Sequence, residues 1–153
     1  MASRPTPEGE AVFRLMLEVL QTFHKLRAVG AEEGAVTTGG GGSWGLMRSL
    51  ADGGPQTVPA IARSRPVSRQ HIQKLADELA ADGLVAFVDN PVHKRSKLLS
   101  LTPAGRARYK TVTSRIQEIA DQIGRGLDAK EVGAAADLLA GIRARLGGGD
   151  KSN

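Results

Sequence analysis

The central part of the chain constrains the fold more strongly than any other feature. A short helical pattern at residues 59–63 is followed by a four-residue turn at 64–67 and by a longer helical pattern at 69–82. Ser68 is a residue type that caps helix N-termini, and Gly83 is one that ends helices. Two helices joined by a short turn, the second with a polar N-terminus, predict a helix-turn-helix.

A predicted β-hairpin follows this pair of helices directly. Residues 84–88 and 98–101 are the expected strands, and the segment between them begins at Asn90 and carries the basic triplet 93–95 at its tip. A surface hairpin of another kind could also place Lys and Arg at its tip to prevent edge pairing. Immediately behind a helix-turn-helix, however, such a hairpin is typical of a wing, whose long cations can enter the adjacent minor groove of DNA.

The rest of the chain predicts further helices. Apolar residues at steps of three and four mark amphipathic helices at 8–33, 44–51, 103–126 and 128–146. Ser43, at the end of a glycine-rich loop, is expected to cap the second of these helices, and Asp128 is expected to cap the last. The predicted fold class is therefore mainly α with a small β-wing (α+β).

The apolar stripes near the two ends of the chain predict a dimer. They are too long for a winged helix-turn-helix at 43–102 to cover, and packing them against a second copy solves this. We therefore expect residues 1–33 and 103–147 to form a helical dimerisation region, followed by a tail at 148–153. The alternative is that the terminal helices fold back on one another within a monomer.

Charge is concentrated in the predicted DNA-binding part. The formal net charge is +5, and residues 59–110 contain ten Lys or Arg against four Asp or Glu, which makes this segment +6 and the remainder −1. A basic module in an otherwise nearly neutral chain indicates a polyanionic partner, here double-stranded DNA. A merely soluble basic surface would have the same charge, so charge alone does not decide.

Several functional classes are excluded by what the sequence lacks. There is no cysteine, and the three histidines show no metal-ligand spacing, so we expect no disulfide, metal or cofactor. No Ser/His/Asp set or paired carboxylates favour an enzyme. No apolar run approaches the roughly 18 residues needed to span a bilayer, and no signal-like segment opens the chain. We expect a cytoplasmic protein without a membrane partner.

The outward face of the predicted helix 69–82 carries side chains suited to a major groove. Arginine pairs with guanine and glutamine with adenine, whereas a solvated helix face is the alternative for this element taken alone. Ser68 is expected to be a cap first and a DNA contact second, and His71, at the edge of the face, to contact phosphate. The complete set of expected DNA contacts is Ser68, Arg69, Gln70, His71, Gln73, Lys74, Lys94, Arg95 and Lys97.

Three segments resemble the MarR family of bacterial regulators. They are LAADGLV at 79–85, NPVHKR at 90–95 and LTPAGR at 101–106, and the order of elements is similar over residues 8–146. The resemblance implies an obligate dimer, pseudo-palindromic operator DNA, and release by a small, often aromatic or phenolic, ligand.

The resemblance also assigns a role to the wing and shows two departures. Arg95 matches the wing arginine of the family pattern, whereas Asn90 and His93 replace acids that brace the wing there. We therefore expect the wing tip to be mobile without DNA. Pro66 stands in a turn where glycine is common, which makes that turn stiffer.

A ligand site is expected where the dimerisation and DNA-binding parts meet, around the first, second and fifth helices. Trp44, the only tryptophan, could stack on an aromatic effector, although a core position is the alternative. The candidate ligand residues are Phe23, His24, Trp44, Met47 and Arg48.

The sequence thus predicts a dimeric, sequence-specific DNA-binding regulator of repressor type. Two alternatives remain open: a winged-helix architectural or PadR-like DNA-binding protein without an effector, and a protein-interaction dimer that no longer binds DNA. The intact polar face of helix 69–82 argues against the second.

Overall fold

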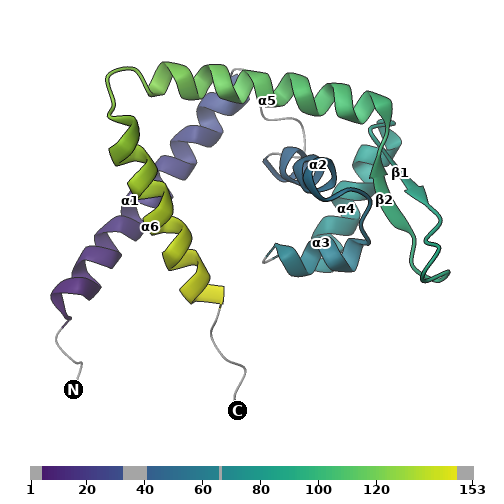
Figure 1. The fold of residues 1–153 in the computed structure, drawn as a ribbon, viewed down its shortest axis with the longest axis horizontal. Helices are drawn as coiled ribbons and strands as arrows, with labels where there is room; N and C mark the ends of the chain where they lie inside the picture. Colours follow the sequence, from purple (N-terminus) through teal and green to yellow (C-terminus); the bar gives the residue numbers. More distant parts are fainter. Residues whose placement is uncertain (1–4, 33–40, 66, 148–153) are drawn as a thin grey trace, which may run out of the picture. The chain divides into compact units, whose positions relative to one another are not determined.

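The structure, a computed structural model, describes residues 5–32, 41–65 and 67–147 (Figure 1). Its elements in chain order are α1 (Pro7–Glu32), α2 (Gly41–Gly53), α3 (Val58–Ser64), α4 (Arg69–Ala81), β1 (Val85–Val88), β2 (Leu98–Leu101), α5 (Pro103–Ile123) and α6 (Ala129–Gly147). The predicted element order and fold class are confirmed. The predicted tail and most of the glycine-rich loop lie outside the described residues.

The start of α2 differs from the prediction. The helix begins at Gly41, so Ser43 lies inside it, 4% exposed, and the prediction that Ser43 is the N-cap was wrong. A Cβ on Gly42 would lie 3.0 Å from Cδ1 of Leu75, so the first turn of α2 packs closely on α4. This tertiary contact outweighs the poor helix propensity of glycine, which the sequence prediction followed.

The start of α3 also differs from the prediction. The helical pattern was predicted from residue 59, whereas the helix begins one residue earlier. Thr57 is its N-cap, with an extended backbone, and its Oγ1 accepts a hydrogen bond from the Ala60 N–H at 3.3 Å. Val58 is the first helical residue, and a proline follows it in the first turn, where a missing N–H costs nothing.

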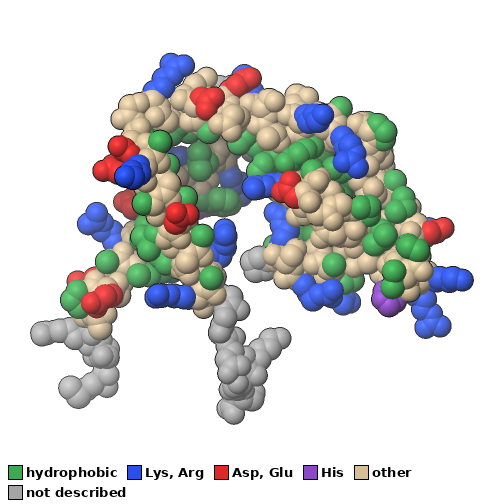
Figure 2. Space-filling view, in the orientation of Figure 1, with side chains coloured by type: hydrophobic (Ala, Val, Ile, Leu, Met, Phe, Trp, Pro, Cys, Tyr) green, Lys and Arg blue, Asp and Glu red, His purple; other side chains and the backbone are tan. Residues whose placement is uncertain are grey.

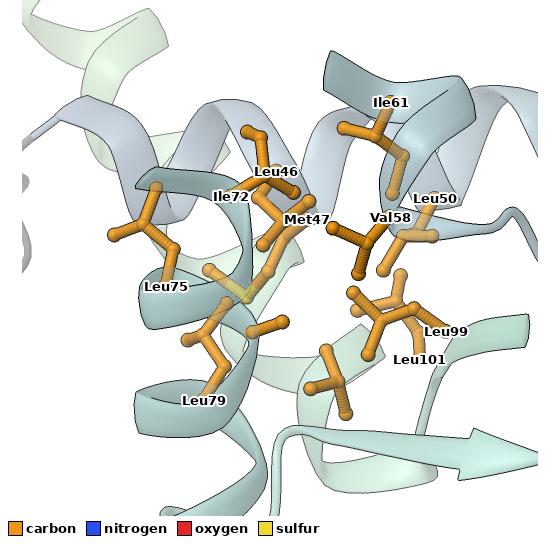
Figure 3. Close-up of a cluster of buried hydrophobic side chains, with 12 residues drawn as sticks. Leu46, Met47, Leu50, Val58, Ile61, Ile72, Leu75, Leu79, Leu99 and Leu101 are labelled. Atoms are coloured by element: carbon orange, nitrogen blue, oxygen red, sulfur yellow. The ribbon is translucent and has the colours of Figure 1, made fainter. Parts of the chain in front are cut away.

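One hydrophobic core joins α2, α3, α4 and the two strands (Figure 3). Leu46 and Met47 of α2, Ile61 of α3, Ile72 of α4 and Leu99 of β2 are all less than 2% exposed. Burying a side chain of this size contributes about 1.5–3 kcal/mol. The core therefore fixes α4 and the hairpin on one scaffold.

The two strands form an antiparallel hairpin, and one residue from outside the hairpin also pairs with β2. Val85 pairs with Leu101 and Val88 with Leu98, and Gln56 forms an isolated bridge with Leu99. The Gln56 N–H donates to the Leu99 carbonyl at 3.1 Å, and the Leu99 N–H donates back at 2.7 Å. The segment before α3 is thereby attached to β2.

The start of α5 closes this scaffold. Thr102 Oγ1 donates to the Gly83 carbonyl at 2.7 Å and accepts from the Gly105 N–H at 3.0 Å, so it caps α5 and joins it to the end of α4. Gly105 lies so close to the backbone of Leu84 that a Cβ would collide with the Leu84 carbonyl. Val112, two turns further along α5, is 2% exposed.

The contacts divide the chain into two compact units after Ile116, within α5. The first includes the winged helix-turn-helix. The second holds the end of α5, a turn in which Gly126 has φ +81°, and α6. Asp128 Oδ1 accepts from the N–H groups of Lys130 at 2.7 Å and Glu131 at 3.1 Å, so the predicted cap of α6 is confirmed.

Large apolar side chains remain exposed on helices outside the core. Those on α1 are between 37% and 63% exposed: Val12, Phe13, Met16, Leu17, Val19, Leu20, Phe23, Leu26 and Val29. On α6, Val132, Leu138, Leu139 and Leu146 are exposed as well. Each of the two helices thus has apolar side chains that its own unit leaves exposed.

Residues 5–32, 41–65 and 67–147 contain neither a candidate membrane span nor a candidate metal cluster. None of the helices in these ranges is long and apolar enough to cross a membrane. No group of three or more His, Asp or Glu side chains within them could hold a metal ion.

The close approach at Gly105 gives a first prediction. Gly105→Ala should lower the free energy of unfolding by about 1–3 kcal/mol, because the added Cβ forces α5 away from Leu84. Gly133→Ala on α6 is the matched control, since its Cβ would meet no atom within 4 Å. Urea unfolding followed by circular dichroism measures both. Equal stability of the two variants would contradict this packing.

Candidate DNA interface

Ser68 sets the N-terminus of α4, the candidate recognition helix. Its backbone is extended, with φ −69° and ψ 152°, and its Oγ accepts a hydrogen bond from the His71 N–H at 3.1 Å. The predicted cap is confirmed. Because Ser68 is exposed, its hydroxyl can still donate to a partner outside the helix.

The two sides of α4 are separated as predicted. Ile72, Leu75, Ala76 and Leu79 are buried in the core. The candidate DNA-contacting side chains of this helix are all exposed: Arg69, Gln70, His71, Gln73 and Lys74. Their exposure is the geometry that a major-groove contact requires, and the contacts themselves stay a prediction.

Two of these side chains bond to acids one turn further along α4. Gln73 Nε2 donates to Asp77 Oδ1 at 2.8 Å, and Lys74 Nζ lies 3.9 Å from Glu78 Oε1. Both pairs are exposed, so solvent and DNA can compete with them. In the free protein the amide of Gln73 is therefore already oriented along the helix.

Two glycines of α2 allow basic side chains of the helix-turn-helix to approach its backbone. His71 Nε2 lies 3.6 Å from the position that a Cβ on Gly42 would take. The guanidinium of Arg65 covers Gly45 so closely that a Cβ there would collide with it. Arg65 Nη1 is buried without a hydrogen-bond partner. Arg65 was not among the predicted site residues, although the spacing of the two glycines, one helical turn apart, could have indicated it.

The wing tip is exposed and built on Asn90. His93, Lys94 and Arg95 are exposed, and Figure 2 shows Lys and Arg side chains with one histidine projecting from this end of the hairpin. Asn90 is only 9% exposed, and its Oδ1 accepts from the N–H groups of Val92 at 3.0 Å and His93 at 3.2 Å.

A third bond closes the same turn, from the Ser96 N–H to the His93 carbonyl at 3.0 Å. The amide of Asn90 thus organises the tip at the position where the family pattern has an acid. The sequence analysis did not assign this role to Asn90, although an Asn-Pro pair is itself a turn signal.

Lys97 lies at the base of the tip. Its Nζ is 3.8 Å from Asp89 Oδ1 on the opposite arm of the hairpin, and the Lys97 side chain is 62% exposed. A contact between Lys97 and DNA therefore has to compete with this ion pair. Lys94 and Arg95 form no ion pair within the described residues.

The candidate ligand residues fall into two groups. On α2, Trp44 Nε1 donates to Thr113 Oγ1 of α5 at 3.1 Å, and Arg48 Cζ lies 5.4 Å from the Trp44 ring centroid. Met47 is fully buried in the core, so it does not line an open site.

The second group is on α1, where the rings of Phe23 and His24 meet edge to face with centroids 5.8 Å apart. Within the described residues, no hydrogen bond, ion pair or ring contact links Phe23 or His24 to the α2 group.

Comparisons with known proteins agree with this geometry. A sequence model of the MarR family matches residues 40–96. An uncharacterized protein of Mycobacterium tuberculosis is 30% identical over 135 residues, which cover 86% of this chain and 91% of that protein.

Solved structures share the fold. MarR of Staphylococcus aureus, in complex with salicylate and kanamycin, has a TM-score of 0.72 at 20% identity, covering 90% of this chain and 91% of that one. BpsR of Bordetella bronchiseptica, whose DNA binding is regulated by 6-hydroxynicotinic acid, has a TM-score of 0.71 at 19% identity, covering 85% and 98%.

The hydrogen bonds of Asn90 give the second prediction. Asn90→Ala should leave the core folded and raise the exchange rates of the Val92 and His93 amide protons about fivefold, because each hydrogen bond contributes about 1 kcal/mol. Asn90→Asp keeps the acceptor oxygen and should preserve their protection. NMR of the three proteins measures these rates. Unchanged rates in Asn90→Ala would show that another interaction holds the tip.

Proposed function

The chain belongs to the MarR family of winged-helix, DNA-binding transcriptional regulators, and we propose that it acts as a homodimeric repressor that a small aromatic or phenolic ligand releases from a pseudo-palindromic operator. One observation carries the DNA-reading part of this proposal. The polar face of α4 and the basic wing tip are both exposed on a single rigid core within the +6 segment.

Base reading is assigned to the first two turns of α4. Arg69 can donate two hydrogen bonds to guanine, and Gln70 and Gln73 can each bond adenine. Lys74 reaches guanine or phosphate. The wing residues Lys94, Arg95 and Lys97 would contact the adjacent minor groove and its phosphates, as long cations do where that groove is narrow. Ser68 and His71 are assigned to contacts with the phosphate backbone of DNA.

The exposed apolar stripes of α1 and α6 support the homodimer. Each would bury its apolar face against the same helices of a second copy, which the hydrophobic effect favours by about 25 cal/mol for every Å² removed from water. A two-fold dimer presents two recognition helices, and an operator with inverted half-sites matches that symmetry.

The homodimer and its operator can be tested together. Sedimentation at micromolar concentration should give twice the 16.1 kDa of the chain. Selection of bound duplexes from random DNA should return inverted repeats with half-site centres about 10 bp, or a multiple of that, apart. A 16.1 kDa species that selects single half-sites would reject the dimer while leaving DNA binding intact.

Substitutions on α4 test the assignment of base contacts. Arg69→Ala and Gln73→Ala should each weaken binding to the selected duplex by about 1–3 kcal/mol per half-site and relax the preference for one base pair. Binding to random DNA should change less. Arg125→Ala, at an exposed arginine in the turn between α5 and α6, is the control for the loss of one positive charge. Equal weakening on all sequences would reassign Arg69 and Gln73 to phosphates.

The effector is proposed to bind near Trp44, with Phe23 and His24 as further candidates. Arg48 would pair with an acidic group of the effector in competition with Asp52, whose Oδ2 lies 3.5 Å from Arg48 Nε in an exposed ion pair. Two structural neighbours are described with salicylate or 6-hydroxynicotinic acid, which are small aromatic acids. Because Trp44 is the only tryptophan, its fluorescence reports on this site alone.

Salicylate is the probe for the effector proposal. It should quench Trp44 fluorescence and weaken DNA binding over the same concentration range. DNA binding that no small aromatic acid or phenol alters would favour the alternative, a winged-helix regulator without an effector. We also propose a cytoplasmic location and no catalytic role, since the family and the fold are those of transcriptional regulators.

A further inference from the structure

Val92 is an apolar side chain in the middle of the polar wing tip. It is 77% exposed, more than any other exposed large hydrophobic residue of the described ranges. Most of the others lie on α1, α5 and α6, outside the winged-helix core. The proposed homodimer would not bury Val92, because its contacts are assigned to α1 and α6 and the wing is assigned to DNA.

Local hydrogen bonds shape the backbone around Val92. Its N–H donates to Asn90 Oδ1 at 3.0 Å, Pro91 precedes it with a restricted φ, and the Ser96 to His93 bond closes the turn behind it. A valine side chain has a single rotatable bond, which is stiff because Cβ is branched. Little conformational entropy is therefore lost when Val92 contacts a partner.

The neighbours of Val92 identify the partner by charge. Residues 93–95 following it are His, Lys and Arg, all exposed. Such a cluster attracts a polyanion, and the minor groove that a wing reaches is about 6 Å wide, with apolar faces of the sugars as its walls. Some minor-groove proteins also place apolar side chains beside their cations, where larger ones act as wedges between base steps.

We infer that Val92 is a further DNA-contacting residue, packing against the deoxyribose walls of the minor groove while Lys94 and Arg95 contact phosphates or the groove floor. This inference rests on the proposed DNA-binding function. The side chain of Val92 is too short to separate stacked bases, so the contact adds affinity without kinking the duplex.

An apolar contact differs from an ionic one in its response to salt. Each phosphate neutralised contributes roughly 0.9 to the slope of log affinity against log salt concentration, whereas contact with a sugar displaces no counterion. Loss of Val92 should therefore lower affinity at every salt concentration equally. Loss of Arg95 should lower affinity and flatten the slope.

The test uses the full chain and the duplex obtained by selection, with fluorescence anisotropy at several salt concentrations. Val92→Ala should bind about three- to tenfold more weakly per dimer, because the two methyl groups lost from each wing would be only partly buried against the sugars. Its salt slope should equal that of the unsubstituted protein. Val92→Ile, the matched control, keeps the apolar contact and should bind at least as tightly. Arg95→Ala should flatten the slope by up to about 2 if both copies contact phosphate.

Hydroxyl-radical footprinting adds a direct readout, since these radicals attack sugars from the minor groove. Val92→Ala should lose protection at the wing positions and keep it elsewhere in the half-site. Binding and protection equal to the unsubstituted protein would overturn the inference. So would unchanged DNA binding with lost repression in a reconstituted transcription reaction, which would assign Val92 to a protein partner. Absence of DNA binding by the unsubstituted chain would reject the proposed function itself, and with it this inference.

Discussion

The packing of α4 on α2 determines where the other functional groups of the winged helix lie. Leu75 of α4 meets α2 at Gly42, where the absence of a Cβ lets the two helices approach closely. With Ile72 and Leu79 buried on the same side, the polar side of α4 can only face outward. β1 follows α4 after a short turn that contains Gly83, with φ +70°, so the position of the helix also sets the position of the wing.

Sequence periodicity was sufficient for those parts of the fold that depend on local chemistry. The spacing of Ile72, Leu75, Ala76 and Leu79 predicted the buried side of α4 correctly, because a helix of period 3.6 leaves one choice of face. Ser68 and Asp128 were correctly predicted as caps, since a short oxygen-bearing side chain before an amphipathic pattern has few other roles. The exposure of the candidate DNA-binding face followed from the same pattern.

The remaining features depend on contacts between segments that the sequence does not align. Ser43 was expected to be a cap because glycine is a poor helix former. The helix α2 begins earlier, at Gly41, because its first turn packs on α4. Met47 was a ligand candidate on helix position alone, and only the core shows it to be fully buried. Arg65 and Asn90 were missed because their roles depend on backbone groups, the backbone of Gly45 and the N–H groups of the wing tip. The glycine spacing and the Asn-Pro pair indicate these contacts only indirectly.

The acids on the exposed side of α4 have a consequence for selectivity. Asp77 holds the amide of Gln73 and Glu78 lies beside Lys74, so each acts as an internal substitute for the base or phosphate that DNA would provide. If Gln73 and Lys74 contact DNA as proposed, each contact must first displace its intrahelical acid. A base pair that offers Gln73 a replacement hydrogen bond would compensate for that loss, whereas one that offers none would leave Asp77 and Glu78 facing phosphates of like charge. On that proposal the two carboxylates would weaken binding to random DNA more than binding to the operator.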